Sequence, residues 1–281
     1  MLRVAEPVVR PVLRSVIGAR RGGGVSPVPP YDPASLFGAS EVGMFYDPQT
    51  IGTLFQDTAG TVPVTADGQL VARINDRSGN GYHLTQATPA NQYVYKDVAG
   101  VRWLDSGGRQ CIYDSGRKLT GGLTIGISVR PETFATTRTW FDTGSGSASA
   151  VNSIYMDRAG SSKFVRFHER AASVLTQRST STLYEDKHLA YVARLQAVSG
   201  DTNHLIFGDA ALSDSTGRLF GNTTSGTGLR LGPTDGAAPL RWYGAIFIQR
   251  VISDVERDAL IGWLSEIGET ETPYLWMGDA T

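Results

Sequence analysis

The acidic residues of this 281-residue chain do not form the pair that glycoside hydrolysis needs. That reaction places two carboxylates across a sugar, one as nucleophile or base and one as acid. No strand-like segment of the E-x-D-x-x-E kind occurs. The densest acids, Asp254, Glu256 and Asp258, fall in a predicted helix, where capping and the helix dipole explain them. A glycoside hydrolase is therefore the weaker alternative, and we expect no enzyme.

Nucleophiles and metal ligands are scattered as well. The sequence has no G-x-S-x-G elbow for a serine triad, no P-loop and no dinucleotide fingerprint. Cys111 is the only cysteine, so an intrachain disulfide is excluded, and its apolar neighbours predict a buried, inert thiol. The histidines lack the spacing of zinc ligands, so we expect no cofactor, with calcium as the weaker alternative. They are His83, His168, His188 and His204.

Two groups of residues are candidates for ligand binding. Asp76 and Asn80 lie in a turn and could offer oxygen ligands to Ca²⁺, although Asp, Ser, Gly and Asn are also what a tight turn needs. The aromatic residues Trp103, Trp140 and Trp242 are candidate platforms for a glycan. Most large aromatics of a sandwich belong to its core, and a shift of one residue in strand register would reverse the face of each.

The spacing of apolar residues predicts an all-β fold. Leu123, Ile125, Ile127 and Val129 alternate with small polar residues, which is the period-2 pattern of a strand with one buried face. Similar short runs recur along the chain, separated by turn residues, and 33 glycines fit many tight turns. No strand alternates with a long helix, so a parallel α/β sheet is not expected. The pattern is typical of an antiparallel β-sandwich.

One helix is predicted near the C-terminus, over residues 253–267. Ser253 and Glu256 have the spacing of a capping box, in which each side chain binds the other residue's backbone N–H. Gly268 would then end the helix. The apolar residues at helical spacing predict one buried face. They are Val255, Ala259, Leu260, Trp263, Leu264 and Ile267.

Residues 1–38 differ in composition and predict an extended arm and linker. The net charge of residues 1–25 is +4 (five arginines and Glu6), against −1 for the whole chain and therefore about −5 for the remainder. The arm is either a disordered tail or a segment that orders on a partner. Arginines mixed with apolar residues favour a protein partner over nucleic acid. The expected docking residues are Arg3, Val9, Arg10, Val12, Leu13, Arg14, Val16 and Ile17.

Several of these motifs resemble a known superfamily. The segment 75–83, NDRSGNGYH, resembles the turn near the start of laminin-G-like (LamG), concanavalin A-like domains. Residues 242–260 resemble the last strand and closing helix of the same superfamily. A narrower resemblance, carried by residues 45–48, 53–57 and 60–69, is to proteins encoded in tailed bacteriophages and prophages.

The resemblance implies an all-β, concanavalin A-like jelly roll over residues 39–281 with one C-terminal helix and an N-terminal arm. It implies a non-enzymatic virion protein (a spike, fibre or decoration) that is held to other virion proteins by the arm and attaches to the host surface. A homo-oligomer, assembled in the host cytoplasm and released by lysis, is expected, without nucleic acid or membrane insertion. The alternative is a module whose main role is to bind host polysaccharide.

Overall fold

The computed structural model describes residues 31–117, 119, 122–132, 139–142, 153–158, 165–171, 174–179, 188–195, 203–207, 211–214, 229–232 and 239–268. Between residues 139 and 214 the description covers the backbone alone, except at Phe141 and residues 188–194. The chain divides into two units after Pro30, and the folded unit begins at Tyr31. The expected anchoring residues of the arm therefore lie outside the described residues.

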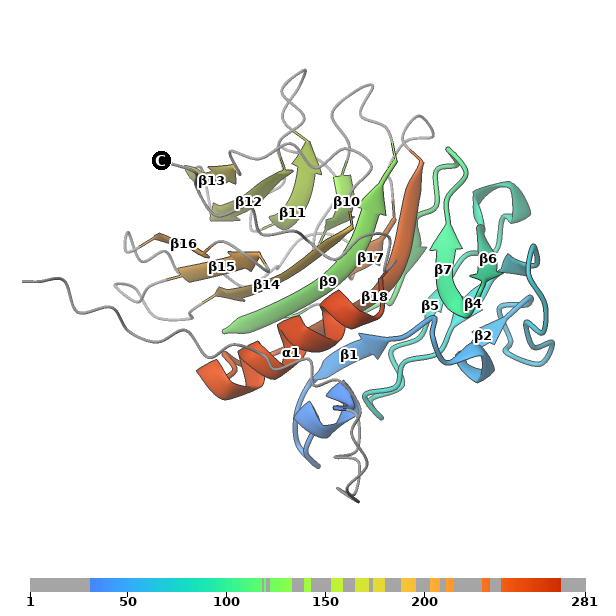
Figure 1. Cartoon of the computed structure of the whole chain (residues 1–281), viewed down its shortest axis with the longest axis horizontal. Coiled ribbons are helices and arrows are strands. Elements are labelled where there is room, and N and C mark those ends of the chain that lie inside the picture. The colour runs from blue at the N-terminus through green and yellow to red at the C-terminus, as the bar shows by residue number, and fades with distance from the viewer. Residues whose placement is uncertain are drawn as a thin grey trace, which may run out of the picture. The chain divides into compact units, whose positions relative to one another are not determined.

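The folded unit consists of two antiparallel sheets and a helix, α1 (Asp254–Glu266), so the predicted all-β class is confirmed (Figure 1). In the described residues, sheet A has nine strands, and β1 and β7 pair with different parts of β18. Its order is β16 (Ala211–Asp214), β15 (Asn203–Phe207), β14 (Leu189–Leu195), β9 (Leu123–Pro131), β18 (Leu240–Ile248), β7 (Val101–Asp105), β6 (Tyr93–Val98) and β3 (Leu70–Val71), with β1 (Gly43–Tyr46) beside β18.

Sheet B also has nine strands in the described part of the chain. Its order is β13 (Val174–Ser179), β12 (Val165–Ala171), β11 (Ser153–Arg158), β10 (Thr139–Asp142), β17 (Arg230–Leu231), β8 (Tyr113–Asp114), β5 (Leu84–Thr85), β4 (Arg73–Ile74) and β2 (Leu54–Phe55). Three 3₁₀ turns complete the described elements: η1 (Pro33–Leu36), η2 (Ile51–Thr53) and η3 (Pro89–Asn91). None of the described helices is both long and apolar enough to cross a membrane.

The central strand β9 has the predicted alternation, but both of its faces are buried. Leu123, Ile125, Ile127 and Val129 lie in the main core, where residues of both sheets pack together. The residues between these four lie on the other face of β9, where α1 packs against β9 and β14 (Figure 1). A Cβ atom at Gly126 would lie 3.0 Å from Leu260 Cδ2, so small residues on this face let the helix approach closely.

The predicted capping box of α1 is confirmed. The Ser253 hydroxyl accepts from the backbone N–H of Glu256, and the Glu256 carboxylate accepts from the backbone N–H of Ser253 at 2.8 Å. Leu260 and Leu264 are buried against sheet A. Val255 is 80% exposed, so its predicted burial is wrong.

Residues before the predicted boundary at 38 belong to the sandwich. Leu36 is buried in the cluster beneath α1, with Tyr31 and Phe37 packed against it. Asp32 caps η1 through the backbone N–H of Ala34 and forms an ion pair with Arg77 at 3.0 Å. The boundary therefore falls between residues 30 and 31, because residues 31–38 pack on the same outer face of sheet A as α1.

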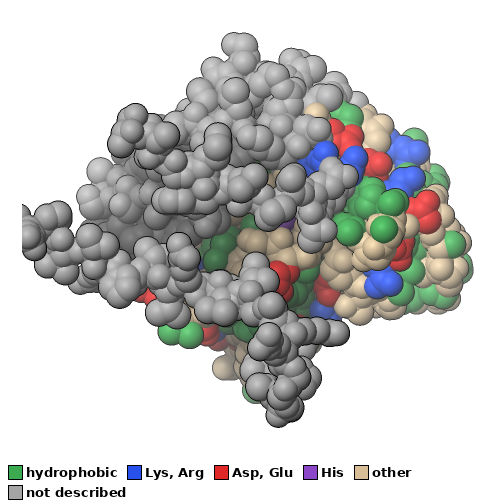
Figure 2. All heavy atoms as spheres, in the orientation of Figure 1, with side chains coloured by type: hydrophobic (Ala, Val, Ile, Leu, Met, Phe, Trp, Pro, Cys, Tyr) green, Lys and Arg blue, Asp and Glu red, His purple; other side chains and the backbone are tan. Residues whose placement is uncertain are grey.

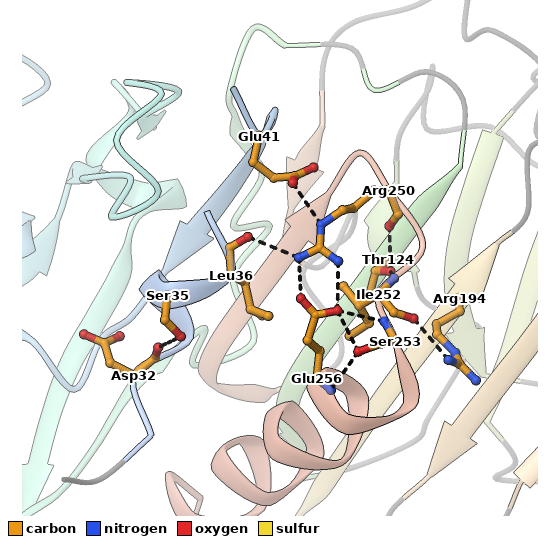
Figure 3. A network of polar contacts seen from close by, with 10 residues as sticks. All are labelled: Asp32, Ser35, Leu36, Glu41, Thr124, Arg194, Arg250, Ile252, Ser253 and Glu256. Atoms are coloured by element: carbon orange, nitrogen blue, oxygen red, sulfur yellow. Dashed lines mark hydrogen bonds and ion pairs between the residues drawn. The ribbon is translucent and has the colours of Figure 1, made fainter. Parts of the chain in front are cut away.

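Arg250 joins η1, the loop before β1, and α1 (Figure 3). Its guanidinium donates to Glu41 at 2.9 Å, to the Leu36 carbonyl at 3.3 Å and to both carboxylate oxygens of Glu256, at 2.6 and 3.0 Å. The hydrogen bonds from Arg250 lower the pKa of Glu256 to about 2. Nearby, Arg194 donates to the Ile252 carbonyl at 3.1 Å. These contacts hold the start of α1 on sheet A.

Candidate functional site

The Asp76 carboxylate organises the turn that the sequence suggested as a calcium site. Its Oδ1 accepts from the backbone N–H groups of Phe45 and Ser78, both at 2.9 Å. Its Oδ2 accepts from the Ser78 hydroxyl at 2.8 Å and from the Tyr82 backbone N–H at 3.1 Å. Two hydrogen bonds to each oxygen use the lone pairs that a turn-stabilising carboxylate offers.

Asn80 also forms hydrogen bonds with β1, the strand that the Asp76 carboxylate contacts through Phe45. Its amide nitrogen donates to the carbonyls of Glu41 and Gly43, both at 3.0 Å. One edge of β1 pairs with β18, and the turn around Asp76 and Asn80 binds backbone groups along the other. Covering a strand edge in this way prevents it from pairing with another chain. Within the described residues, no three or more His, Cys, Asp or Glu side chains are grouped to hold a metal ion.

Two of the three candidate glycan platforms are buried, in keeping with the expectation that most large aromatics of a sandwich belong to its core. Trp242 is 3% exposed and points into the main core, where its ring stacks on Tyr93 at 6.5 Å between centroids. Trp103 is 7% exposed, and the Arg241 guanidinium covers its ring, with Cζ 5.0 Å from the ring centroid. The side chain of Trp140 lies outside the described residues.

The most promising site is instead the outer-face cluster, which we define as Trp103, Asp105, Arg130, Glu132, Arg241 and Tyr243. Strand register brings it together: Arg241 on β18 lies opposite Arg130 on β9 and opposite Asp105 on β7. The register shifts between Trp242 and Gly244, which leaves Tyr243 as an extra residue in β18. Such a bulge redirects a side chain, and the Tyr243 ring lies 6.4 Å from that of Trp103.

Arg241 and Glu132 are the accessible part of this cluster. Arg241 Nε donates to Glu132 Oε1 at 2.5 Å, and the two side chains are 25% and 27% exposed. A guanidinium can only donate hydrogen bonds and an ionised carboxylate can only accept them, so the pair offers both kinds of partner at one place. In the view of Figure 2, hydrophobic side chains on the described part of the surface are bordered by acidic and basic ones.

A serine and a histidine meet beside this cluster, in a pairing that sequence analysis did not find. Ser128 Oγ lies 2.6 Å from His188 Nε2, and the His188 ring meets Tyr243 edge-on at 5.3 Å. The pairing of β9 with β14 brings the two residues together across 60 positions, so no local motif could reveal it.

This Ser–His pair does not have the properties of a nucleophile and its base. Ser128 is fully buried, so its hydroxyl is not presented to a substrate. Burial, and then the positive charge of Arg130, lower the pKa of His188 to about 4, which makes the imidazole a weak base near neutral pH. The contact between His188 and Gly268 is also structural. The Gly268 backbone passes so close to the His188 ring that a Cβ atom at position 268 would clash with it. Close approach, rather than a left-handed C-cap, explains this glycine.

No family model matches the chain, and no curated protein matches it in sequence. Solved structures do match in fold. The binding domain of Paraclostridial Mosquitocidal Protein 1 superposes with a TM-score of 0.54 at 10% identity, over 69% of this chain and 50% of that one. The binding domain of botulinum neurotoxin serotype G gives 0.51 at 12% identity, over 68% and 48%. Trypanosoma rangeli sialidase gives 0.50 at 12% identity, over 82% and 34%.

The chain therefore spans about half the length of the two toxin binding domains and a third of the sialidase. At these identities the likeness concerns the fold. The chain is an antiparallel β-sandwich of the kind found in those binding domains.

Proposed function

We propose that the chain is a non-enzymatic, lectin-like module that binds a host-surface glycan and is displayed on a tailed-phage virion through its N-terminal arm. The observation that carries the binding role is the outer-face cluster, where the partly exposed Arg241–Glu132 pair lies over an aromatic ring. Sugar hydroxyls both donate and accept, so they complement a guanidinium beside a carboxylate. The pair is supported by three neighbouring strands of one sheet, which keeps its geometry rigid.

Two further considerations favour binding over catalysis. The Ser128–His188 pair is buried and its histidine is a weak base. Two of the solved structures with this fold are named as binding domains, and the analogy supports a binding role at the level of fold. The virion setting rests on the resemblance of residues 45–69 to phage-encoded proteins. In that setting the module is present in several copies, following the symmetry of the particle.

The fluorescently labelled full chain is expected to bind at least one polysaccharide on an array of bacterial surface glycans. Binding should saturate, should be lost on heat denaturation, and should release no new reducing ends from the bound polymer. Bound polymer that is shortened would identify a hydrolase, and an array without any saturable signal would refute the binding role.

Deleting residues 1–25 is expected to reduce incorporation of the protein into phage particles at least about tenfold, because the arm supplies the anchor. The melting temperature should be unchanged, since the folded unit begins at Tyr31. The measurement is the amount of protein per purified particle.

A matched variant separates the two kinds of partner. Replacing the five arm arginines with lysine keeps the charge but removes bidentate pairing with carboxylates. Reduced incorporation of this variant supports a protein partner, whereas full incorporation supports a purely electrostatic contact with nucleic acid. Normal incorporation of the deletion variant would overturn the anchor. The arginines are Arg3, Arg10, Arg14, Arg20 and Arg21.

A further inference from the structure

Charges of both signs meet in the outer-face cluster. Arg130, Arg241 and Asp105 lie in one row across β9, β18 and β7, and Glu132 follows Arg130 by two residues, just beyond the end of β9. Lys96 on β6 lies opposite Trp103 and adds a further cation at the border of the cluster. A carboxylate or sulfate placed at the acceptor position beside Glu132 would be repelled by that carboxylate at close range, whereas a hydroxyl would not.

The cluster also contains a hydrogen-bond donor without an acceptor. The indole nitrogen of Trp103 is buried and donates to no acceptor among the described residues. Burying such a donor unpaired is costly, and groups of this kind are commonly satisfied by water or by a ligand. Glu132 contributes an acceptor: its Oε1 accepts from Arg241, and each carboxylate oxygen can accept more than one hydrogen bond. The cluster therefore offers a buried donor and a carboxylate acceptor.

We infer that this cluster binds a neutral saccharide through neighbouring hydroxyl groups. One hydroxyl donates to Glu132 and accepts from Arg241, and the indole nitrogen of Trp103 supplies a further donor at the base of the cluster. A vicinal diol presents two such groups side by side, which a guanidinium–carboxylate pair complements without any change in net charge. This inference rests on the proposed glycan-binding function and names the site and the class of sugar.

The requirement for hydroxyls predicts selectivity. A site built to hydrogen-bond a hydroxyl discriminates strongly against an analogue that lacks it, because its buried polar groups then stay unpaired. Discrimination against anionic sugars arises where the anionic group would have to lie against Glu132 in place of a hydroxyl. The expected ligands are thus neutral hexose polymers rather than sialic acid or uronic acid polymers.

The test measures binding of the full chain to immobilised polymers by biolayer interferometry. The neutral probes are dextran, mannan and galactan, and the anionic probes are polysialic acid and polygalacturonate. Two variants act on the cluster: Glu132→Gln keeps the shape but removes the charged acceptor, and Trp103→Phe keeps an aromatic ring but removes the donor. The control is Arg257→Ala, because Arg257 on α1 also pairs with carboxylates, Asp254 at 2.7 Å and Asp258 at 2.6 Å.

The wild-type chain should bind at least one neutral polymer more tightly than either anionic polymer. Glu132→Gln should weaken that binding about tenfold or more, and Trp103→Phe about threefold or more. Arg257→Ala should stay within about twofold of the wild type, because Arg257 lies on α1, outside the cluster, and its carboxylate partners are exposed. Near-UV circular dichroism identifies any variant that is misfolded, and the other cluster variant then decides the outcome.

Failure of the inference is distinguishable from failure of the function. Tighter binding to the anionic polymers, or unchanged binding by folded cluster variants, overturns the inference while a binding wild-type chain still supports a glycan-binding module. A wild-type chain that binds none of the immobilised polymers and nothing on the array of bacterial glycans overturns both the inference and the proposed glycan-binding function.

Discussion

Replacing Asp76 with alanine is expected to lower the free energy of unfolding by about 3 kcal/mol or more. Its carboxylate accepts four hydrogen bonds, three of them from the backbone groups of Phe45, Ser78 and Tyr82. The bond to Phe45 joins the turn to β1, a strand that contributes to the main core. Loss of the carboxylate would leave these donors unpaired and release one edge of β1.

Urea denaturation of the wild type and the variant, with and without EDTA, measures this effect and separates the two roles considered for Asp76. The matched control is Asp57→Ala: Asp57 also accepts from two backbone N–H groups of its own turn, but it is exposed and joins no distant strand. That change should destabilise the chain much less than Asp76→Ala does. If EDTA destabilises the wild type as much as Asp76→Ala does, a bound calcium ion holds the turn and the hydrogen-bond account is wrong.

Lowering the pH from about 6.5 towards 4 is expected to destabilise the sandwich through His188. The pKa of this residue is lowered from 6.5 to about 4, first by burial and then by Arg130. In this window the unfolded chain binds a proton at the imidazole and the folded chain does not, so stability falls as the pH falls. A shift of this size corresponds to a loss of about 3 kcal/mol once the pH reaches 4.

The measurement is urea denaturation at a series of pH values between about 7.5 and 4.5, which brackets the unfolded pKa of histidine. The variant His188→Gln keeps a hydrogen-bonding group opposite Ser128 but does not titrate, and its stability should change less across this range. His83→Gln is the control, because the pKa of His83 is also lowered by burial but its site lies at the Asp76 turn. An unchanged pH slope in His188→Gln would show that other groups cause the acid sensitivity.

The pKa of Glu256, about 2, places its contribution at lower pH: stability from this carboxylate is lost as the pH falls below its unfolded value of 4.5.

The local features of the fold follow from the sequence. The alternation in β9 and the capping box of α1 are both present as predicted, because each depends on backbone geometry and hydrogen bonds within a few residues. The turn residues Asp76 and Asn80 were identified for the same reason. Their second role, the covering of β1, involves contacts 31 and 37 residues away and could not be inferred from the motif.

The position of the candidate site was decided by the tertiary structure alone. Arg241 and Glu132 are 109 residues apart in sequence and meet because β18 pairs with β9. Trp103 and Trp242 were equivalent candidates in the sequence, yet strand register turns Trp242 into the core and leaves Trp103 beneath Arg241 on the outer face. Side-chain direction reverses with each residue of a strand, so which face a residue occupies is settled only when the strands pair. The sequence by itself determined the strands, the helix and the turn, while the pairing of distant strands determined which charges and rings came together.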